Sequence, residues 1–198
     1  MVGPLTSLAS CARLVSLSMS SNQVSGTLEP LASCPLLQII KLSNNDLSGT
    51  LDALKACTAL RTLIIPNNAI TGTLDGLADH AHLKLLDASF CQLACTLDPL
   101  QGCPALETAL LSGNQQLTST LPPLYGLAHL AKLDVKSTNV RSTKADRKHF
   151  GRRLTAAAMP VEDQPQLAKE KSASAIAAAA RGRAARKAAK TATPQSGD

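Results

Sequence analysis

The sequence predicts an α/β solenoid, in which short parallel strands line a concave face and turns or short 3-10 or α segments lie on the convex face. A leucine period of 23 residues places Leu14, Leu37, Leu60, Leu83 and Leu106 in one column, and such periods are typical of stacked repeats. Of the 198 residues 44% are apolar, but only one Tyr, two Phe and no Trp are among them. A stacked leucine core has no centre that aromatic side chains must fill.

Each row follows the pattern L-x-x-L-x-L-x-x-N-x-L-x-G-T-L, and we expect a strand at L-x-L. In the second row the pattern consists of Leu37, Ile40, Leu42, Asn45, Leu47, Gly49, Thr50, Leu51, Leu54 and Cys57. One row cannot bury its leucines alone, so rows must stack. We expect a solenoid over residues 1–143, with five full rows and a partial row at each end. Its strands should form one apolar column of Leu17, Ile40, Leu63, Leu86 and Ala109.

Polar and small residues recur where the chain leaves each expected strand. Asparagine stands there at Asn22, Asn45, Asn68 and Asn114, and Cys91 and Thr138 replace it in two rows. An inward amide can pair backbone groups of the turn that burial would otherwise leave unpaired. A tight bend should follow at Gly26, Gly49 and Gly72. A column of threonines, expected to bond neighbouring backbone, consists of Thr27, Thr50, Thr73, Thr96 and Thr120.

The pattern resembles the leucine-rich repeat family over about residues 5–143. The resemblance implies a right-handed coil in which L-x-L forms a short parallel strand on the concave side. The S-G-T-L motif is similar to plant-type and protist repeats, whereas the row length is similar to the shorter intracellular class. The sequence leaves both subclasses open.

The six cysteines suggest structural rather than chemical roles. One position of the repeat holds Cys11, Cys34, Cys57 and Cys103, with His80 in the remaining row, so we expect a column of small buried groups. Disulfides between adjacent rows and a metal site are the alternatives, but no C-x-x-C pair is present. The sequence has no phosphate-binding glycine loop and no catalytic motif. We therefore expect no enzyme activity, no cofactor and no metal.

A protein-binding site is expected on the concave face, where side chains between the column leucines point outward. The candidate residues are Ile39, Lys41, Ile64, Leu85, Asp87, Phe90 and Leu110. Apolar residues on an otherwise polar strand face are typical of an interface, and an aromatic such as Phe90 is the best single anchor. The alternatives are an ordinary scatter of apolar residues or a cover formed by the chain's own tail.

The two ends of the solenoid differ. The first strand row, Leu14–Met19, has only half a coil before it, and this edge could meet another chain end to end or mark a shortened product. At the other end, Thr143 and Asp146 suggest a capping box for a helix over residues 144–160. Phe150, Leu154 and Ala158 would lie on one face of that helix and cover the last coil.

Charge separates the chain into two parts. Residues before Arg141 hold 7 basic and 9 acidic side chains, a balance of −2, and the rest holds 13 and 5, a balance of +8. Residues 161–198 are rich in Ala, Lys and Arg, and we expect a disordered tail. Its electrostatic candidates are Arg181, Arg183, Arg186, Lys187 and Lys190. RNA or another polyanion fits their charge, through phosphates rather than base stacking.

The function predicted first is a non-catalytic adaptor or scaffold that binds a protein partner on the concave face. The second is a ribonucleoprotein component, resembling leucine-rich spliceosomal subunits, whose tail contacts RNA. The third is a secreted or surface leucine-rich repeat protein from a truncated gene. No signal peptide and no transmembrane segment is visible in the sequence, so we expect an intracellular address, cytoplasmic or nuclear.

Overall fold

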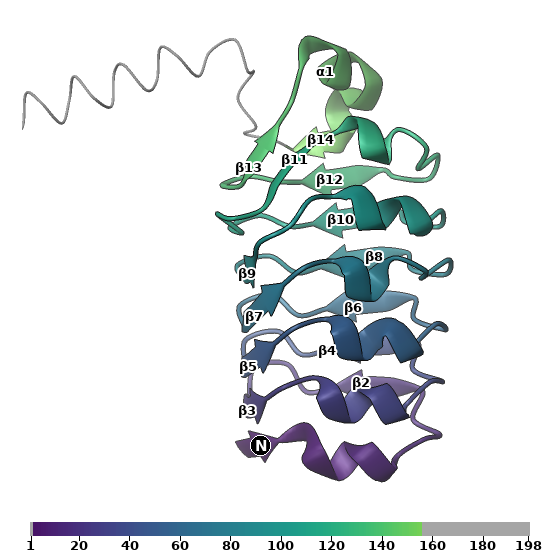
Figure 1. The fold of residues 1–198 in the computed structure, drawn as a ribbon, viewed down its shortest axis with the longest axis vertical. Coiled ribbons are helices and arrows are strands. Elements are labelled where there is room, and N and C mark those ends of the chain that lie inside the picture. The colour runs from purple at the N-terminus through teal and green to yellow at the C-terminus, as the bar shows by residue number, and fades with distance from the viewer. Residues whose placement is uncertain (1, 156–198) are drawn as a thin grey trace, which may run out of the picture. The chain divides into compact units, whose positions relative to one another are not determined.

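The computed structural model describes residues 2–155, so residues 156–160 of the expected cap and the expected tail lie outside them. The described rows form coils that stack in chain order (Figure 1). Each coil gives one strand to a parallel seven-stranded sheet of order β14-β12-β10-β8-β6-β4-β2. These strands are β2 (Ser16–Ser18), β4 (Ile39–Lys41), β6 (Thr62–Ile64), β8 (Leu85–Asp87), β10 (Thr108–Leu110), β12 (Lys132–Asp134) and β14 (Leu154–Thr155). The solenoid and its parallel strands are confirmed.

Each coil also contains a second short strand, which the sequence pattern did not predict. A five-stranded sheet is formed by β1 (Val2–Pro4), β3 (Gln23–Gly26), β5 (Asp46–Gly49), β7 (Ala69–Gly72) and β9 (Gln92–Leu93), and a separate pair by β11 (Thr118–Thr120) and β13 (Asn139–Arg141). Gly26, Gly49 and Gly72 have φ of 86°, 80° and 80°. The expected tight bend is therefore present in these rows, at the end of each second strand.

The convex face consists of short 3-10 helices. They are η1 (Leu5–Ser10), η2 (Glu29–Ser33), η3 (Asp52–Ala56), η4 (Asp75–Leu77), η5 (Asp98–Gly102) and η6 (Pro122–Leu124). Just before η3, the Thr50 hydroxyl donates to Asp52 Oδ2 at 2.8 Å and accepts from the Asp52 N–H at 3.4 Å. Thr73 and Asp75 repeat this arrangement. These threonines thus bond neighbouring backbone, as expected, within their own coil, and they also bond the aspartate side chain.

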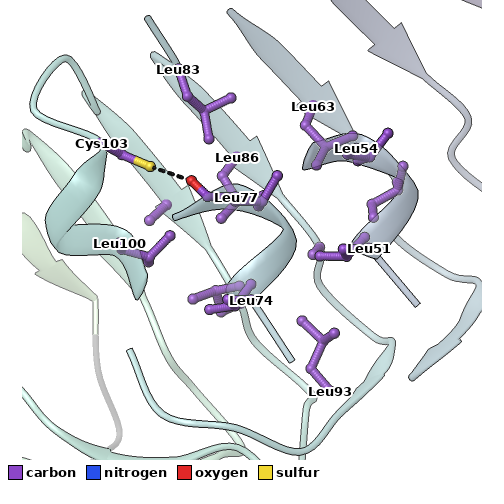
Figure 2. Packing of buried hydrophobic residues seen from close by; sticks show 14 of the residues in the cluster. Leu51, Leu54, Leu63, Leu74, Leu77, Leu83, Leu86, Leu93, Leu100 and Cys103 are labelled. Carbon is purple, nitrogen blue, oxygen red and sulfur yellow. Dashed lines mark hydrogen bonds between the residues drawn. The ribbon is translucent and has the colours of Figure 1, made fainter. Parts of the chain in front are cut away.

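Leucines from the strands and from the 3-10 helices meet between the two faces (Figure 2). Leu63 and Leu86 come from the strands and Leu54 and Leu77 from the helices, and all four are completely buried. The strand register aligns Leu63 with Ile40 on one side and with Leu86 on the other, as expected for a continuous column. Because full burial of one leucine stabilises by about 1.5–3 kcal/mol, the repeated column is sufficient to order coils that lack aromatics.

Buried asparagines tie successive coils together where the chain leaves the concave sheet. Asn68 Oδ1 accepts from the Leu47 N–H at 3.0 Å, and its Nδ2 donates to Leu42 O at 2.9 Å and to Ile65 O at 3.0 Å. The same bonds at the same sequence offsets are made by Asn45 and Asn114. We call these three residues the asparagine ladder. Adjacent members share a carbonyl, since Leu42 O also accepts from Asn45 Nδ2 at 3.0 Å, and the expected pairing of turn groups is confirmed.

Cys91 and Thr138 replace asparagine for different reasons. Cys91 is a weaker substitute, whose Sγ donates to Ile65 O at 3.6 Å. The row before Thr138 has 24 residues and places one more residue between Asn114 and Leu117. As a result the Leu117 N–H bonds to Asn114 O of its own turn at 3.1 Å. That N–H needs no amide from the next coil, and the Thr138 hydroxyl bonds within its own turn: it donates to Val135 O at 2.6 Å and accepts from the Val140 N–H at 3.3 Å.

The column of cysteines and His80 is buried as expected, except for the half-buried Cys11. Cys57 Sγ donates to Leu31 O at 3.5 Å, and His80 Nε2 donates to Leu54 O at 3.1 Å, in both cases 26 residues earlier in the chain. His80 is 1% exposed, and its Nδ1 is the one buried side-chain nitrogen or oxygen of the described residues that has no hydrogen-bond partner. All six cysteines are free.

The C-terminal cap begins as predicted but ends earlier. Helix α1 (Lys144–Phe150) has a capping box in which the Thr143 hydroxyl accepts from the Asp146 N–H at 3.2 Å. The expected helix over 144–160 stops at Phe150, because Gly151 adopts φ of 52°. A 3-10 turn, η7 (Gly151–Arg153), then leads into β14, and Leu154 pairs with Leu133. Leu154 therefore lies in a strand of the concave sheet and not in the expected helix.

The cap contains an aromatic cluster that the sequence pattern did not indicate. Tyr125, from the last coil, stacks on the His149 ring with centroids 4.1 Å apart, and Phe150 meets Tyr125 edge to face at 5.7 Å. The Tyr125 hydroxyl donates to Asp146 Oδ1 at 2.5 Å. Hydrogen bonds from Tyr125 and Thr143 outweigh burial and lower the pKa of Asp146. The cap is thus fixed to the last coil by both stacking and a charged acceptor.

Candidate protein-binding face

Two columns of outward side chains cover the concave face, and the strand register defines both. The first column consists of Ser16, Ile39, Thr62, Leu85, Thr108 and Lys132. The second consists of Ser18, Lys41, Ile64, Asp87, Leu110 and Asp134. Six of the seven predicted site residues lie in these columns, and Phe90 lies beyond the end of β8.

Between β4 and β10, apolar and polar residues alternate along both columns, and the two columns are out of step by one strand. Ile39 and Leu85 are apolar in the first column, and Ile64 and Leu110 in the second. These four side chains are half-buried, and consecutive members lie on diagonal positions of adjacent strands, about 7–8 Å apart. They therefore form a zigzag across the face rather than one compact patch. We call these four residues the apolar zigzag.

Phe90 is the most exposed large apolar side chain of the described residues, at 60%. Its backbone has φ of 53°, in the left-handed region that disfavours a bulky residue, at a cost of order 1–3 kcal/mol. The Phe90 N–H donates to Ser112 O at 2.7 Å and holds this conformation. A Cβ on Gly113, the corresponding residue of the next coil, would meet Phe90 Cδ1 at 2.5 Å. Glycine there leaves room for the ring beside the next turn.

The column that contains Phe90 is otherwise polar or small. All its members have a backbone in the left-handed region, and they are Ser21, Asn44, Asn67, Phe90, Gly113 and Ser137. Asn67 Nδ2 donates to Asn44 Oδ1 at 2.8 Å, and Asn44 Nδ2 donates to Ser21 Oγ at 3.4 Å. This exposed hydrogen-bonded edge leads along the rim to Phe90. Sequence reasoning missed the asparagines and Gly113, although aligning the rows at Phe90 would have found them.

Asp87 is half-buried in the middle of the second column. Its Oδ1 accepts from the Ser89 N–H at 3.1 Å, which orders the turn after β8. The ion pairs of the described residues, Lys55 with Asp52 and Lys84 with Glu107, both at 2.8 Å, do not involve it. Lys41, the other charged candidate, is exposed.

Three buried thiols are unreactive at neutral pH. Desolvation raises the pKa of the Cys57, Cys91 and Cys103 thiols to about 11, so these groups are neutral at pH 7 and are poor nucleophiles. Among residues 2–155, no three His, Cys, Asp or Glu side chains are arranged to hold a metal ion. No helix in this part of the chain is long and apolar enough to cross a membrane.

The predicted electrostatic residues from Arg181 to Lys190 lie outside the described residues, so the structure does not place them. At the N-terminal edge, a hollow of about 290 Å³ is lined by seven residues: Gly3, Pro4, Leu5, Ser7, Leu8, Met19 and Val24. The expected end-to-end contact with another chain at this edge stays a prediction.

The fold and the face define a class: a repeat solenoid with a parallel strand face and a single aromatic residue at its rim. No protein-family model matches the sequence, and no curated protein matches it. Several solved structures are similar to it. The plant peptide hormone receptor RGFR1 in complex with RGF2 superposes with a TM-score of 0.69 and 30% identity, covering 76% of this chain and 25% of the receptor chain.

Two further structures show the same architecture. A TDR receptor matches with a TM-score of 0.68 and 25% identity over 77% of this chain and 28% of its own. An internalin from Listeria monocytogenes matches with a TM-score of 0.56 and 20% identity over 78% and 51%. The chain spans about a quarter of the length of the plant receptor chains. It is a leucine-rich repeat protein.

Proposed function

We propose that the chain is a non-catalytic adaptor or scaffold that holds a protein partner on its concave face. The observation that carries the proposal is Phe90, which is 60% exposed in a disfavoured backbone conformation beside the apolar zigzag. Backbone strain at an exposed aromatic is more typical of a binding position than of a packing requirement. The similar RGFR1 structure is a complex with RGF2, and a HAESA structure is a complex with the peptide hormone IDA, which supports a protein-interaction role.

A pull-down with the full chain tests the proposal. The variant combines Phe90→Ala with Ile64→Asp, which removes the exposed ring and places a charge in the zigzag. A matched control combines Leu36→Asp with Val15→Ala, because these side chains are 50% and 46% exposed and lie outside both columns. Partners lost with the first variant and kept with the second support the concave face, provided that both variants keep a cooperative circular dichroism melt. Equal recovery with both would refute it.

An intracellular address, cytoplasmic or nuclear, is part of the proposal. Support comes from the six free cysteines, all of them in the apolar interior or packed against it, since cysteines of secreted domains commonly form disulfides. Fluorescence microscopy of the tagged full chain tests the address. The RNA role of the basic tail is tested in the same pull-down by nuclease treatment, because partners bound through phosphates would be lost.

A segment of a larger surface protein is the second candidate. The chain's 30% identity to part of a plant peptide hormone receptor, over about a quarter of the receptor chain, favours this candidate. An antibody against residues 1–150 distinguishes the two on an immunoblot of native tissue. A band near 20.6 kDa supports the small adaptor, and a much larger band supports the surface protein.

A further inference from the structure

We propose that Asp87 makes the concave face selective for a protein segment that presents a basic side chain flanked by apolar residues. This inference rests on the proposed function, because it names the kind of partner that the same face takes.

Asp87 is surrounded by apolar side chains. The strand register places it directly between Ile64 on β6 and Leu110 on β10. Leu85, two residues earlier on the same strand, faces the same side of the sheet. All three are half-buried. A carboxylate in such surroundings is shielded from water on several sides, and an ion pair formed there is stronger than one on an open surface.

The other charged residues of the second column have different neighbours. Lys41 is exposed and pairs with Ser18 on one side. Asp134 lies two residues from Lys132 and two from Lys136, so basic side chains flank it within its own coil. Asp87 has no such compensation, because Leu85 and Ser89 occupy the matching positions of its coil. Asp87 is therefore the position beside the apolar zigzag where an ion pair with a partner's cationic group would be strongest.

One carboxylate oxygen of Asp87 is committed and the other is available. Oδ1 accepts from the Ser89 N–H at 3.1 Å, and no hydrogen bond or ion pair from another described residue engages Oδ2. An aspartate used only to order the turn would need one oxygen and no charge. Because the amide of an asparagine could accept the same N–H bond, the charge can be removed while the turn is kept.

The surroundings suit the side chain of lysine or arginine better than a bare cation. Their aliphatic stems can lie along Ile64 and Leu110 while the charged end reaches the carboxylate. A guanidinium can also stack on an aromatic ring, and Phe90 follows Asp87 by three residues at the rim. Flanking apolar residues of the partner would contact the zigzag. An extended segment crossing the strands meets a new coil about every 4.8 Å, so neighbouring side chains of the partner can reach these positions.

The test selects peptides from a random dodecapeptide library displayed on phage, with the full chain as target. Asp87→Asn is the variant, and Asp46→Asn is the matched control, because Asp46 is exposed on β5 outside the concave sheet. We expect peptides selected on the unaltered chain to be enriched in Arg or Lys next to large apolar residues. Synthetic copies should bind Asp87→Asn about tenfold more weakly at 0.15 M salt and bind Asp46→Asn unchanged. Asp87→Lys should select acidic residues instead.

The outcomes separate this inference from the proposed function. Peptides that lack basic residues, or that bind Asp87→Asn as well as the unaltered chain, overturn the role of Asp87 and leave the binding face intact. Peptides insensitive to the paired Phe90→Ala and Ile64→Asp substitutions overturn the face itself. If the occupant is a second copy of the chain, sedimentation equilibrium would show a dimer that Asp87→Lys weakens. That result also overturns the assignment to a peptide segment.

Discussion

Replacing Cys91 by asparagine should stabilise the solenoid, because it would complete the asparagine ladder. Cys91 stands between Asn68 and Asn114, and its thiol supplies one donor, at 3.6 Å from Ile65 O. Since burial raises the pKa of this thiol to about 11, it is protonated at neutral pH. An asparagine could donate to Ile65 O and to Ala88 O and accept from the Ile70 N–H, by analogy with its two neighbours.

The magnitude follows from the bonds that would change. In Asn68 and Asn114 the three ladder bonds are 2.9–3.0 Å long. The substitution adds one such bond and replaces two weak sulfur contacts, to Ile65 and Ile70. At about 0.5–1.5 kcal/mol for each net bond, less the cost of burying an amide, we expect a gain of about 1–2 kcal/mol. For a domain of this size that is a Tm increase of roughly 2–8 °C.

Urea unfolding followed by far-UV circular dichroism under reducing conditions measures the change in the free energy of unfolding. The reverse substitution, Asn68→Cys, is the matched control and should lose a similar amount, because it breaks the ladder one coil earlier. An unchanged or lower stability of Cys91→Asn, together with no loss in Asn68→Cys, would refute the view that the ladder bonds hold the coils together.

Three further predictions concern His80, two glycines and the cap. Burial lowers the pKa of His80, so below about pH 6.5 the unfolded chain binds a proton that the folded chain resists. The free energy of unfolding should therefore fall as the pH drops, by up to about 1.4 kcal/mol per pH unit. His80→Cys should flatten this slope in melts between pH 7.5 and 5.5. Gly102→Ala should cost about 2–3 kcal/mol, because its Cβ would lie 1.5 Å from a backbone oxygen, whereas Gly126→Ala, with open space, should be neutral in the same urea assay. Tyr125→Phe removes a hydrogen bond to the Asp146 carboxylate and should lower the free energy of unfolding by about 1.5–3 kcal/mol. An unchanged Tm would show that stacking alone holds the cap.

The repeat made most of the fold predictable. The 23-residue period places Ile40, Leu63 and Leu86 in one column, and the strand register of the structure is the same. The second strand of each coil was not predicted, because Q-V-S-G and D-L-S-G carry only one buried residue each and have no alternating pattern. The cap was half predicted: Thr143 and Asp146 indicate its start, but Gly151 ends the helix through a positive φ that a sequence pattern does not reveal.

The residues of the candidate site and their columns could be predicted from the sequence, but the exposure and arrangement of their side chains could not. Row alignment correctly places Ile64, Asp87 and Leu110 on adjacent strands. It does not show that the apolar side chains are only half-exposed or that they form a zigzag, because exposure depends on how far neighbouring side chains reach. The strained backbone of Phe90 and its contact with Gly113 depend on a turn geometry that the residue types alone do not specify.

The constant sequence offset of the ladder bonds determines how the solenoid can gain or lose coils in evolution. The asparagine ladder and the column of Cys57 and His80 both reach carbonyls 26 residues earlier. Adding or deleting one whole 23-residue row would reproduce every such partner, and would lengthen or shorten the strand face by one rung of about 4.8 Å. A single inserted residue demands a local repair, as the turn from Asn114 to Leu117 illustrates. Duplication of whole rows is therefore the least disruptive route by which such a gene can acquire a longer binding surface.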